Sequence, residues 1–286
     1  MTRNEAEKFS IFSADTVFPA CERPRAIENG IMKKASEYKL PVPKNLARKL
    51  ADKGHPLAAL AAMSEAECRS DLKKTWSAIT HPSNKSLAKY ILGLPKVVLS
   101  EAGEREYWLT FSASDEEKVS IIAAKPGDPL PSLDFPLDTI PGLKEFLTYF
   151  SGVTDWYLPP GSHFCPPSDL RIMWSADEDS AWGLVKEWDG SLVFYAGGTC
   201  DVIVVRKDGR VGKWHHEYAF PDEEYRDRQI AFMKKLGIKF SVSQSKLHQC
   251  PVLDLKCDFG KLVSRYPAYC RLGADSDKKG KTPFYY

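Results

Sequence analysis

The spacing of apolar residues along the chain predicts a helical region ahead of the first strands. Ser64 and Glu67 have the spacing of a capping box, in which the hydroxyl and the carboxylate each accept a hydrogen bond from a free backbone N–H. The helix that follows is expected to end before Pro82, and its apolar stripe consists of Cys68, Leu72, Trp76 and Ile79. Short helices from Pro43 and near residues 87–92 complete this pattern.

Strand patterns begin after residue 95. Residues 1–25 show no period and are predicted to be a loose arm, whereas residues 26–94 form the predicted helical N-terminal region. β-branched and aromatic residues then predict three strands, over 97–100, 107–111 and 119–124.

A helix is expected after these strands. Pro141 suits its first turn and Gly152 its end. Large apolar side chains recur at helical spacing between the two, at Leu143, Phe146, Leu147 and Phe150. This stripe predicts a helix packed on a sheet.

The most regular segment is a predicted hairpin. Residues 191–196 and 201–206 have strand composition, and a returning strand is expected over 210–214. Asp208 and Gly209 lie between the last two strands, where a tight turn needs the positive φ that glycine adopts freely.

Helical and strand signals alternate again near the end of the chain. Residues 221–236 have carboxylates in the first turn and lysines in the last, which complements the helix dipole, and residues 239–243 are expected to form a strand. The whole pattern predicts an α+β fold, with a mixed, largely antiparallel sheet packed against helices. Its core is assigned to residues 95–240, followed by a C-terminal extension and polar tail over 241–286.

Composition narrows the class of protein. The 286 residues include 14 Phe, 12 Tyr and 7 Trp, which is incompatible with a mostly disordered chain. No apolar run approaches the ~20 residues that span a bilayer, and the first residues lack the apolar stretch of a secretory signal. We therefore expect a cytoplasmic protein that does not enter a membrane and whose seven cysteines are reduced.

Charge is distributed unevenly along the chain. Residues 101–235 contain 24 acidic and 14 basic side chains, a net charge of −10, whereas residues 1–100 carry +7 and residues 236–286 carry +5. An acidic middle disfavours nucleic acid as its partner and favours a basic protein, although a solvated acidic surface has the same composition.

Aromatic and acidic residues are interleaved near residue 180. Three carboxylates, Asp177, Glu178 and Asp179, stand between Trp174 and Trp182. A solvated loop, general acid–base catalysis and a protein-binding loop are all compatible with this pattern. The predicted partner-binding residues are Asp177, Glu178, Asp179, Trp182 and Glu187.

Other reactive residues lack the spacing that their chemistry needs. His215 and Glu217 are the two members of the His-His-Glu triplet that alternation along a strand would place on one face. Cys200 has no base assigned by the sequence, although His163, His215 and His216 are candidates.

Two further groups of residues partly match a zinc site and a phosphate loop. The residues of the zinc candidate, which lacks a closely spaced ligand pair, are His248, Cys250, Cys257 and Cys270. The last three residues of a phosphate-loop motif are matched by Gly280, Lys281 and Thr282, but Asp275 stands at the position of the first glycine of that motif. We therefore predict no catalytic residue, no metal and no cofactor.

Two segments together resemble the SUKH superfamily. One is IPGLKEFLTYFSGV at 140–153, similar to the Pro-opened aromatic helix of that family. The other is FYAGGTCDVIVVRKDGRVGKWHHE at 194–217, similar to its strand, glycine-rich bend and Asp-Gly hairpin. The turn at 151–153 departs from the family, whose helix ends in an Asn-Gly-Gly-like turn.

The resemblance covers about a quarter of the chain directly and implies a non-enzymatic binding domain over residues 95–240. Members of the superfamily include bacterial immunity proteins that neutralise toxins and fungal regulators of cell-wall synthesis. The expected function is therefore that of an immunity protein against a cognate polymorphic toxin. A regulatory or scaffold protein of the same fold is the alternative, and a Cys- or carboxylate-dependent hydrolase is the alternative from another class.

Overall fold

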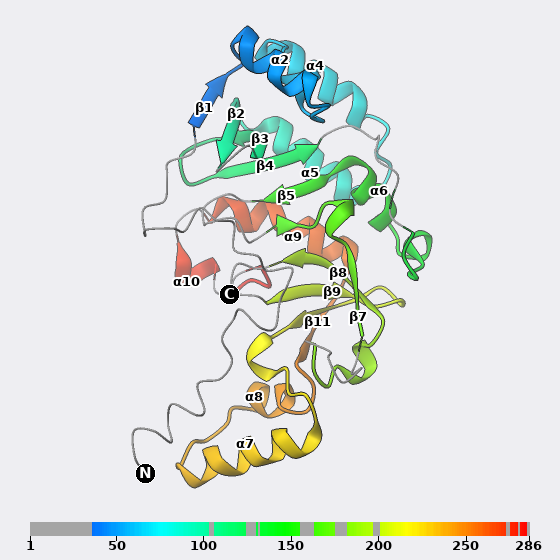
Figure 1. The fold of residues 1–286 in the computed structure, drawn as a ribbon, viewed down its shortest axis with the longest axis vertical. Helices are drawn as coiled ribbons and strands as arrows, with labels where there is room; N and C mark the ends of the chain where they lie inside the picture. The colour runs from blue at the N-terminus through cyan, green and yellow to red at the C-terminus, as the bar shows by residue number, and fades with distance from the viewer. Residues whose placement is uncertain are drawn as a thin grey trace.

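The computed structural model describes residues 36–102, 106–123, 130, 132–154, 163–174, 182–196, 201–272, 275–279 and 281–284. Within these residues, eleven strands form one sheet in the order β1-β2-β3-β4-β5-β6-β8-β9-β10-β11, and β7 pairs with β8 (Figure 1). The strands are β1 (Ser36–Lys39), β2 (Lys96–Ala102), β3 (Glu106–Ser112), β4 (Lys118–Ala123), β5 (Ser151–Thr154), β6 (His163–Phe164), β7 (Arg171–Met173), β8 (Ser191–Ala196), β9 (Val202–Val205), β10 (Arg210–Trp214) and β11 (Val252–Asp258).

Helices accompany the sheet along its length. They are α2 (Lys44–Asp52), α3 (Ala58–Ala61), α4 (Glu65–Trp76), α5 (Pro82–Gly93), α6 (Leu143–Tyr149), α7 (Glu223–Lys235), α8 (Val242–Leu247), α9 (Phe259–Arg271) and α10 (Ser276–Lys279). The predicted α+β fold is confirmed, and each strand pair is antiparallel in the described residues. No helix of the described ranges is long and apolar enough to cross a bilayer.

The main core lies between one face of the sheet and the helices α2 to α6 and α9. Leu109 and Phe111 of β3 point into it, whereas Thr110 lies on the opposite face. There its hydroxyl group is 2.8 Å from those of Ser100 and Ser120, in a buried polar ladder across β2, β3 and β4.

Phe146 occupies the centre of the main core. Its ring centroid lies 5.3 Å from that of Phe150, 5.0 Å from Phe164 and 5.6 Å from Phe259. The four apolar residues of the predicted stripe are all buried, because α6 packs that stripe on the sheet and on α9. Gly152, however, does not end α6: the helix ends at Tyr149, and Gly152 lies in β5.

A second core lies on the other face of the sheet, near β7 to β11. It is smaller, and its buried members are Met173, Val185, Trp188, Val193, Val202, Val204, Trp214 and Val252. Val185 and Trp188, which lie between β7 and β8, belong to this core, and Trp182 packs against it.

The structure of the predicted helical region differs from the prediction at Pro82 and at residues 36–39. Pro82 begins α5 instead of ending the preceding helix, since proline is tolerated in the first turn of a helix. The preceding helix, α4, has the predicted Ser64–Glu67 capping box and ends at Trp76. Residues 36–39 form a strand, β1, which pairs with β2.

The C-terminal part also differs from its sequence pattern. Residues 239–243 do not form a strand, because Ser241 and Gln244 form a capping box that opens α8. Phe284 belongs to the predicted polar tail, yet its ring is buried in the main core beside Tyr195 and Tyr266.

The predicted hairpin and the helix after it are confirmed. Gly209 has φ +86° at the turn between β9 and β10, and Asp222 caps α7. In β11 the register shifts and Lys256 has φ +53°, which marks a bulge. The sheet also includes β1 and β11, which lie before and after the predicted core at 95–240 in the sequence. The division of the chain into segments stays a prediction. The predicted arm at residues 1–25 lies outside the described ranges.

Candidate functional site

A cluster of ionisable groups surrounds Asp201 where β9 begins and β10 ends. The β9–β10 register pairs Val202 with Trp214, so Asp201 lies beside the residues that follow Trp214. His215 Nδ1 is 3.2 Å from Asp201 Oδ2, and Lys213 Nζ is 3.5 Å from the same oxygen. His216 Nδ1 is 3.0 Å from Asp201 Oδ1.

Both histidines reach one carboxylate because β10 ends at Trp214 and the chain turns just after it. On a continuous strand His215 and Glu217 would share one face, but a 3-10 turn, His216–Tyr218, begins directly after His215. Strand alternation therefore stops, and His216 turns back toward Asp201. The strand on which His215 and Glu217 would share a face thus does not extend through these residues.

The cluster shifts the acidity of its members. Burial by itself would raise the pKa of Asp201, but hydrogen bonds from His215 and His216 and the nearby Lys213 ammonium hold that pKa well below its usual value. The hydrogen bond to Asp201 raises the pKa of His216, although burial acts in the opposite direction. Asp201 is therefore an ionised, buried anchor for two imidazoles.

The outer nitrogen of His215 has a different environment. Its Nε2 atom is buried and has no hydrogen-bond partner, whereas Nδ1 faces the carboxylate. A histidine held by an acid through Nδ1 has the orientation of a general base. Cys200 precedes Asp201 in the sequence and lies outside the described residues.

The residues of the zinc candidate do not gather. His248 lies 4.4 Å from Phe240 and 5.2 Å from Tyr218 between ring centroids, and burial lowers its pKa. Cys257 and Cys270 are free thiols in the main core. In the part of the chain that the structure describes, no three His, Cys, Asp or Glu side chains form a possible metal site.

Three of the predicted partner-binding residues, Asp177, Glu178 and Asp179, lie outside the described residues. Trp182 is half-buried against the second core, with its ring centroid 5.1 Å from that of Trp214. Its carbonyl oxygen accepts a hydrogen bond of 2.9 Å from Trp214 Nε1, and the Arg171 guanidinium lies 5.4 Å from its ring centroid. Trp182 therefore fixes one end of the acidic segment on the sheet.

Glu187 is exposed but is balanced by basic groups. Its side chain is 60% exposed, and Oε2 lies 3.4 Å from Arg206 Nη1 and 3.7 Å from Arg210 Nη2. Asp208 is 3.2 Å from Arg210 Nε and is also bonded to Arg206. This part of the surface carries alternating charges and not a bare acidic patch.

Trp174 is a functional candidate that the sequence indicated only as a neighbour of the acidic residues. It is 46% exposed, directly after β7. A Cβ atom on Gly190 would lie 3.7 Å from Cζ3 of this ring, so the ring rests beside that glycine. Exposed tryptophan is the signal, and only the structure distinguishes it from the packed Trp182.

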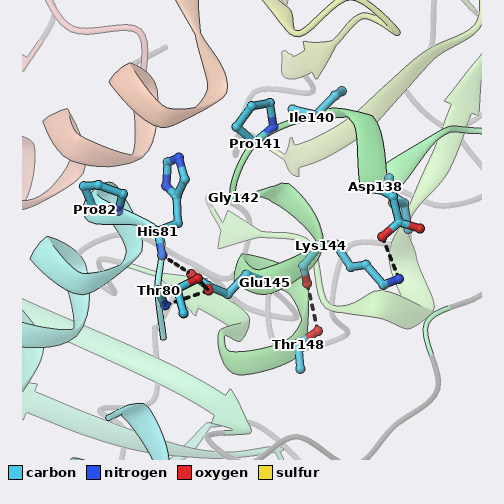
Figure 2. Close-up of a pocket in the computed structure, with 11 residues that line it drawn as sticks. Thr80, His81, Pro82, Asp138, Ile140, Pro141, Gly142, Lys144, Glu145 and Thr148 are labelled. Carbon is cyan, nitrogen blue, oxygen red and sulfur yellow. Dashed lines mark hydrogen bonds and ion pairs between the residues drawn. The ribbon is translucent and has the colours of Figure 1, made fainter. Parts of the chain in front are cut away.

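A separate hollow of about 630 Å³ lies between α6 and the segment before α5 (Figure 2). It is lined by Thr80, His81, Pro82, Leu137, Asp138, Ile140, Pro141, Gly142, Lys144, Glu145 and Thr148. No motif in the sequence indicates it, because residues about 60 positions apart come together there.

The polar groups of the hollow are bonded to one another. The Glu145 carboxylate accepts hydrogen bonds from the Thr80 N–H (2.7 Å), the Thr80 hydroxyl (2.6 Å) and the His81 N–H (2.9 Å), as Figure 2 shows. Burial raises the pKa of Glu145, but these bonds outweigh it and the pKa is lowered. Lys144 is paired with Asp138 at 2.6 Å. The carboxylate therefore acts as a structural clamp.

Comparisons with models of known protein families, with curated proteins and with solved structures find no match to this chain.

Proposed function

We propose that the chain is a cytoplasmic, non-enzymatic protein-binding protein of the SUKH type. Its proposed role is that of an immunity protein, which binds and neutralises a basic cognate toxin. A regulatory or scaffold protein with a basic host partner is the alternative within the same mode of binding.

The exposure of Trp174 is the observation that carries the proposal. Tryptophan is strongly enriched among the residues that dominate protein interfaces, where it fills a pocket of the partner. Trp174 and Trp182 bracket the acidic residues 177–179 in the sequence; the Trp182 ring packs on the second core, whereas the exposed Trp174 ring lies beside Gly190. An aromatic anchor next to three carboxylates suits a basic protein surface.

The acidic residues and Trp174 are expected to affect different rate constants of binding. Glu187 already faces Arg206 and Arg210, so its contribution to long-range attraction is small. The attraction in this proposal comes from Asp177, Glu178 and Asp179, which act mainly on the association rate. Trp174 acts on the dissociation rate.

Binding kinetics test this assignment. The partner is sought by affinity capture from the native organism and by co-expression with any toxin encoded beside the gene, with rescue of growth as the readout. Replacing Asp177, Glu178 and Asp179 by Lys is expected to slow association and flatten its salt dependence. Trp174→Ala is expected to speed dissociation and cost about 2 kcal/mol of binding free energy.

The control is Lys73→Glu with Lys74→Glu, at the exposed end of α4, which also changes charge but lies in the helical N-terminal region. Unchanged association after the triple reversal, together with unchanged dissociation of Trp174→Ala, would refute the proposal. Trp182→Ala is a poor probe, because it also removes packing on Trp214.

A hydrolase is the second candidate, and the pairing of His215 with Asp201 favours it. The carboxylate orients the imidazole, and the buried Nε2 is available to accept a proton from a nucleophile such as a thiol. Hydrolysis of a panel of activated esters and amides by the wild type, lost in His215→Ala and in Cys200→Ala, would support this function. Equal rates for all three proteins would exclude it.

A further inference from the structure

Four of the five large apolar side chains that the described residues expose lie around the turn between α7 and α8. They are Phe232 (37% exposed), Leu236 (58%), Ile238 (46%) and Val242 (75%), and together they are called the apolar tip here. Phe232 lies in the last turns of α7, and Leu236, four residues later, is the residue that caps its end, so the two side chains follow one stripe. α7 and α8 form the lower end of the molecule in Figure 1, at the opposite end from α2 and α4.

The backbone of the apolar tip is held by hydrogen bonds. The Gly237 N–H donates to the Lys234 carbonyl at 2.9 Å, and the Ile238 N–H donates to the Met233 carbonyl at 3.1 Å, which is the hydrogen-bond pattern of a Schellman motif. Ser241 then caps α8. The exposed residues therefore belong to an ordered turn, whose shape is set before any partner binds.

Positive charge surrounds the apolar tip. Residues 228–253 contain no Asp or Glu, and their basic residues are Arg228, Lys234, Lys235, Lys239 and Lys246. Arg228 is paired with Glu224 at 3.7 Å, about one turn nearer the start of α7 than Phe232. The four lysines make no ion pair within the described ranges. An occupant that buries the apolar side chains must therefore bring carboxylates for the rim.

We propose that the apolar tip is a docking surface for an acidic amphipathic helix of another protein. Leucine or isoleucine side chains of that helix would cover Leu236, Ile238 and Val242, and its flanking carboxylates would face Lys235 and Lys239. This surface differs from the one around Trp174 in position and in the sign of its charge, so it does not depend on the proposed function.

The charge along α7 favours a protein segment over a wide anionic surface. Its first turns carry Asp222, Glu223, Glu224 and Asp227, and its last turn carries Lys234 and Lys235. A lipid bilayer or a nucleic acid would face both ends of the helix and meet repulsion at the first. A short acidic helix contacts the apolar tip alone.

The test uses the full chain and a fluorescent peptide of about 20 residues with Leu and Glu at helical spacing; the second probe is the same composition in scrambled order. Anisotropy titration at low salt is expected to show binding about tenfold tighter for the helical pattern than for the scramble. Two double variants are each expected to weaken this binding about tenfold: Leu236→Ser with Val242→Ser, and Lys235→Glu with Lys239→Glu. The matched control is Lys73→Glu with Lys74→Glu, a basic pair in the last turn of α4, which is expected to leave binding unchanged.

Three outcomes would overturn the proposal. The first is that the helical and scrambled peptides bind equally well. The second is that the tip variants bind the helical peptide as tightly as the wild type does. The third is that vesicles containing phosphatidylserine bind the wild type and lose binding in the tip variants, which would identify a lipid surface. All of the substituted side chains are exposed, so each variant is expected to fold, and circular dichroism checks that its total helix content equals that of the wild type.

Discussion

Asp201 Oδ1 accepts hydrogen bonds from both the side chain and the backbone of His216, at 3.0 Å from Nδ1 and 3.3 Å from the main-chain nitrogen. One carboxylate oxygen thus fixes the position where the chain leaves β10 and turns toward α7. Any change in the charge of either residue acts on that junction.

The first prediction concerns pH. Because the hydrogen bond to Asp201 raises the pKa of His216 in the folded state, its stabilising effect is fully present below the unfolded pKa of about 6.5 and is lost as pH rises through the folded pKa. His216→Gln is expected to lower the melting temperature more at pH 5.5 than at pH 8.5. His216 is partly exposed, so solvent screening keeps the effect below about 1 kcal/mol.

His55 supplies the control for this prediction. Burial lowers the pKa of His55, so its neutral form is the one that the fold favours, and the wild type loses stability there as pH falls through the unfolded pKa. The cost of His55→Gln is therefore expected to be smaller at pH 5.5 than at pH 8.5. Two variants with parallel pH profiles would contradict the assigned shifts.

Asp201→Asn tests the buried carboxylate itself. The substitution keeps the shape but removes the charge that balances Lys213 and His216, and it is expected to cost about 2–3 kcal/mol in the free energy of unfolding. Asp115 is fully exposed, and Asp115→Asn is expected to stay within about 0.5 kcal/mol. Urea denaturation of both variants measures the difference, and equal costs would show that the cluster adds nothing to stability.

Phe146→Ala tests the packing of α6. The ring touches three other aromatic rings in the main core, so its removal is expected to cost about 3–5 kcal/mol. Phe232→Ala, on the exposed side of α7, is expected to cost less than about 1 kcal/mol. A melting temperature of Phe146→Ala within two or so degrees of the wild type would disprove the placement of α6.

The turn between β9 and β10 requires the backbone freedom of Gly209. Its φ of +86° strains any residue with a Cβ, so Gly209→Ala is expected to destabilise the fold by about 1–2 kcal/mol. Gly93 ends α5, its φ is not positive, and its Cβ position has no neighbouring atom within 4 Å. Gly93→Ala is therefore expected to be neutral or stabilising by up to about 1 kcal/mol, which thermal unfolding of the pair would establish.

Local sequence patterns predict an element correctly where the period of its apolar residues matches the face that is buried in the fold. The stripe from Leu143 to Phe150 predicted α6 because one face of that helix is buried, and the Asp208-Gly209 turn predicted the hairpin. The pattern failed at residues 239–243, where valine and phenylalanine suggest a strand but the Ser241 cap opens a helix. A local hydrogen bond there outweighs the β propensity of the apolar residues.

The functional surfaces depend on contacts that no local pattern contains. Asp201 and His216 are 15 residues apart, and they meet only because the β9–β10 register and a 3-10 turn place them together. Glu145 and Thr80 are separated by 65 residues. Trp174 and Trp182 are alike in the sequence, and only the second core distinguishes the exposed ring from the packed one.

The bulge in β11 has a consequence for how copies of this chain meet one another. β1 and β11 form the two ends of the sheet in the described residues, and an open sheet end is a template for adding a strand from another molecule. In β11 the Lys256 backbone N–H donates a hydrogen bond of 2.8 Å to the side-chain Oδ1 of Asp254, and the positive φ of Lys256 interrupts the extended backbone. β1 is four residues long and carries Glu37 and Lys39. Neither end offers a straight, uncharged row of donors and acceptors, so the fold resists edge-to-edge growth into cross-β aggregates.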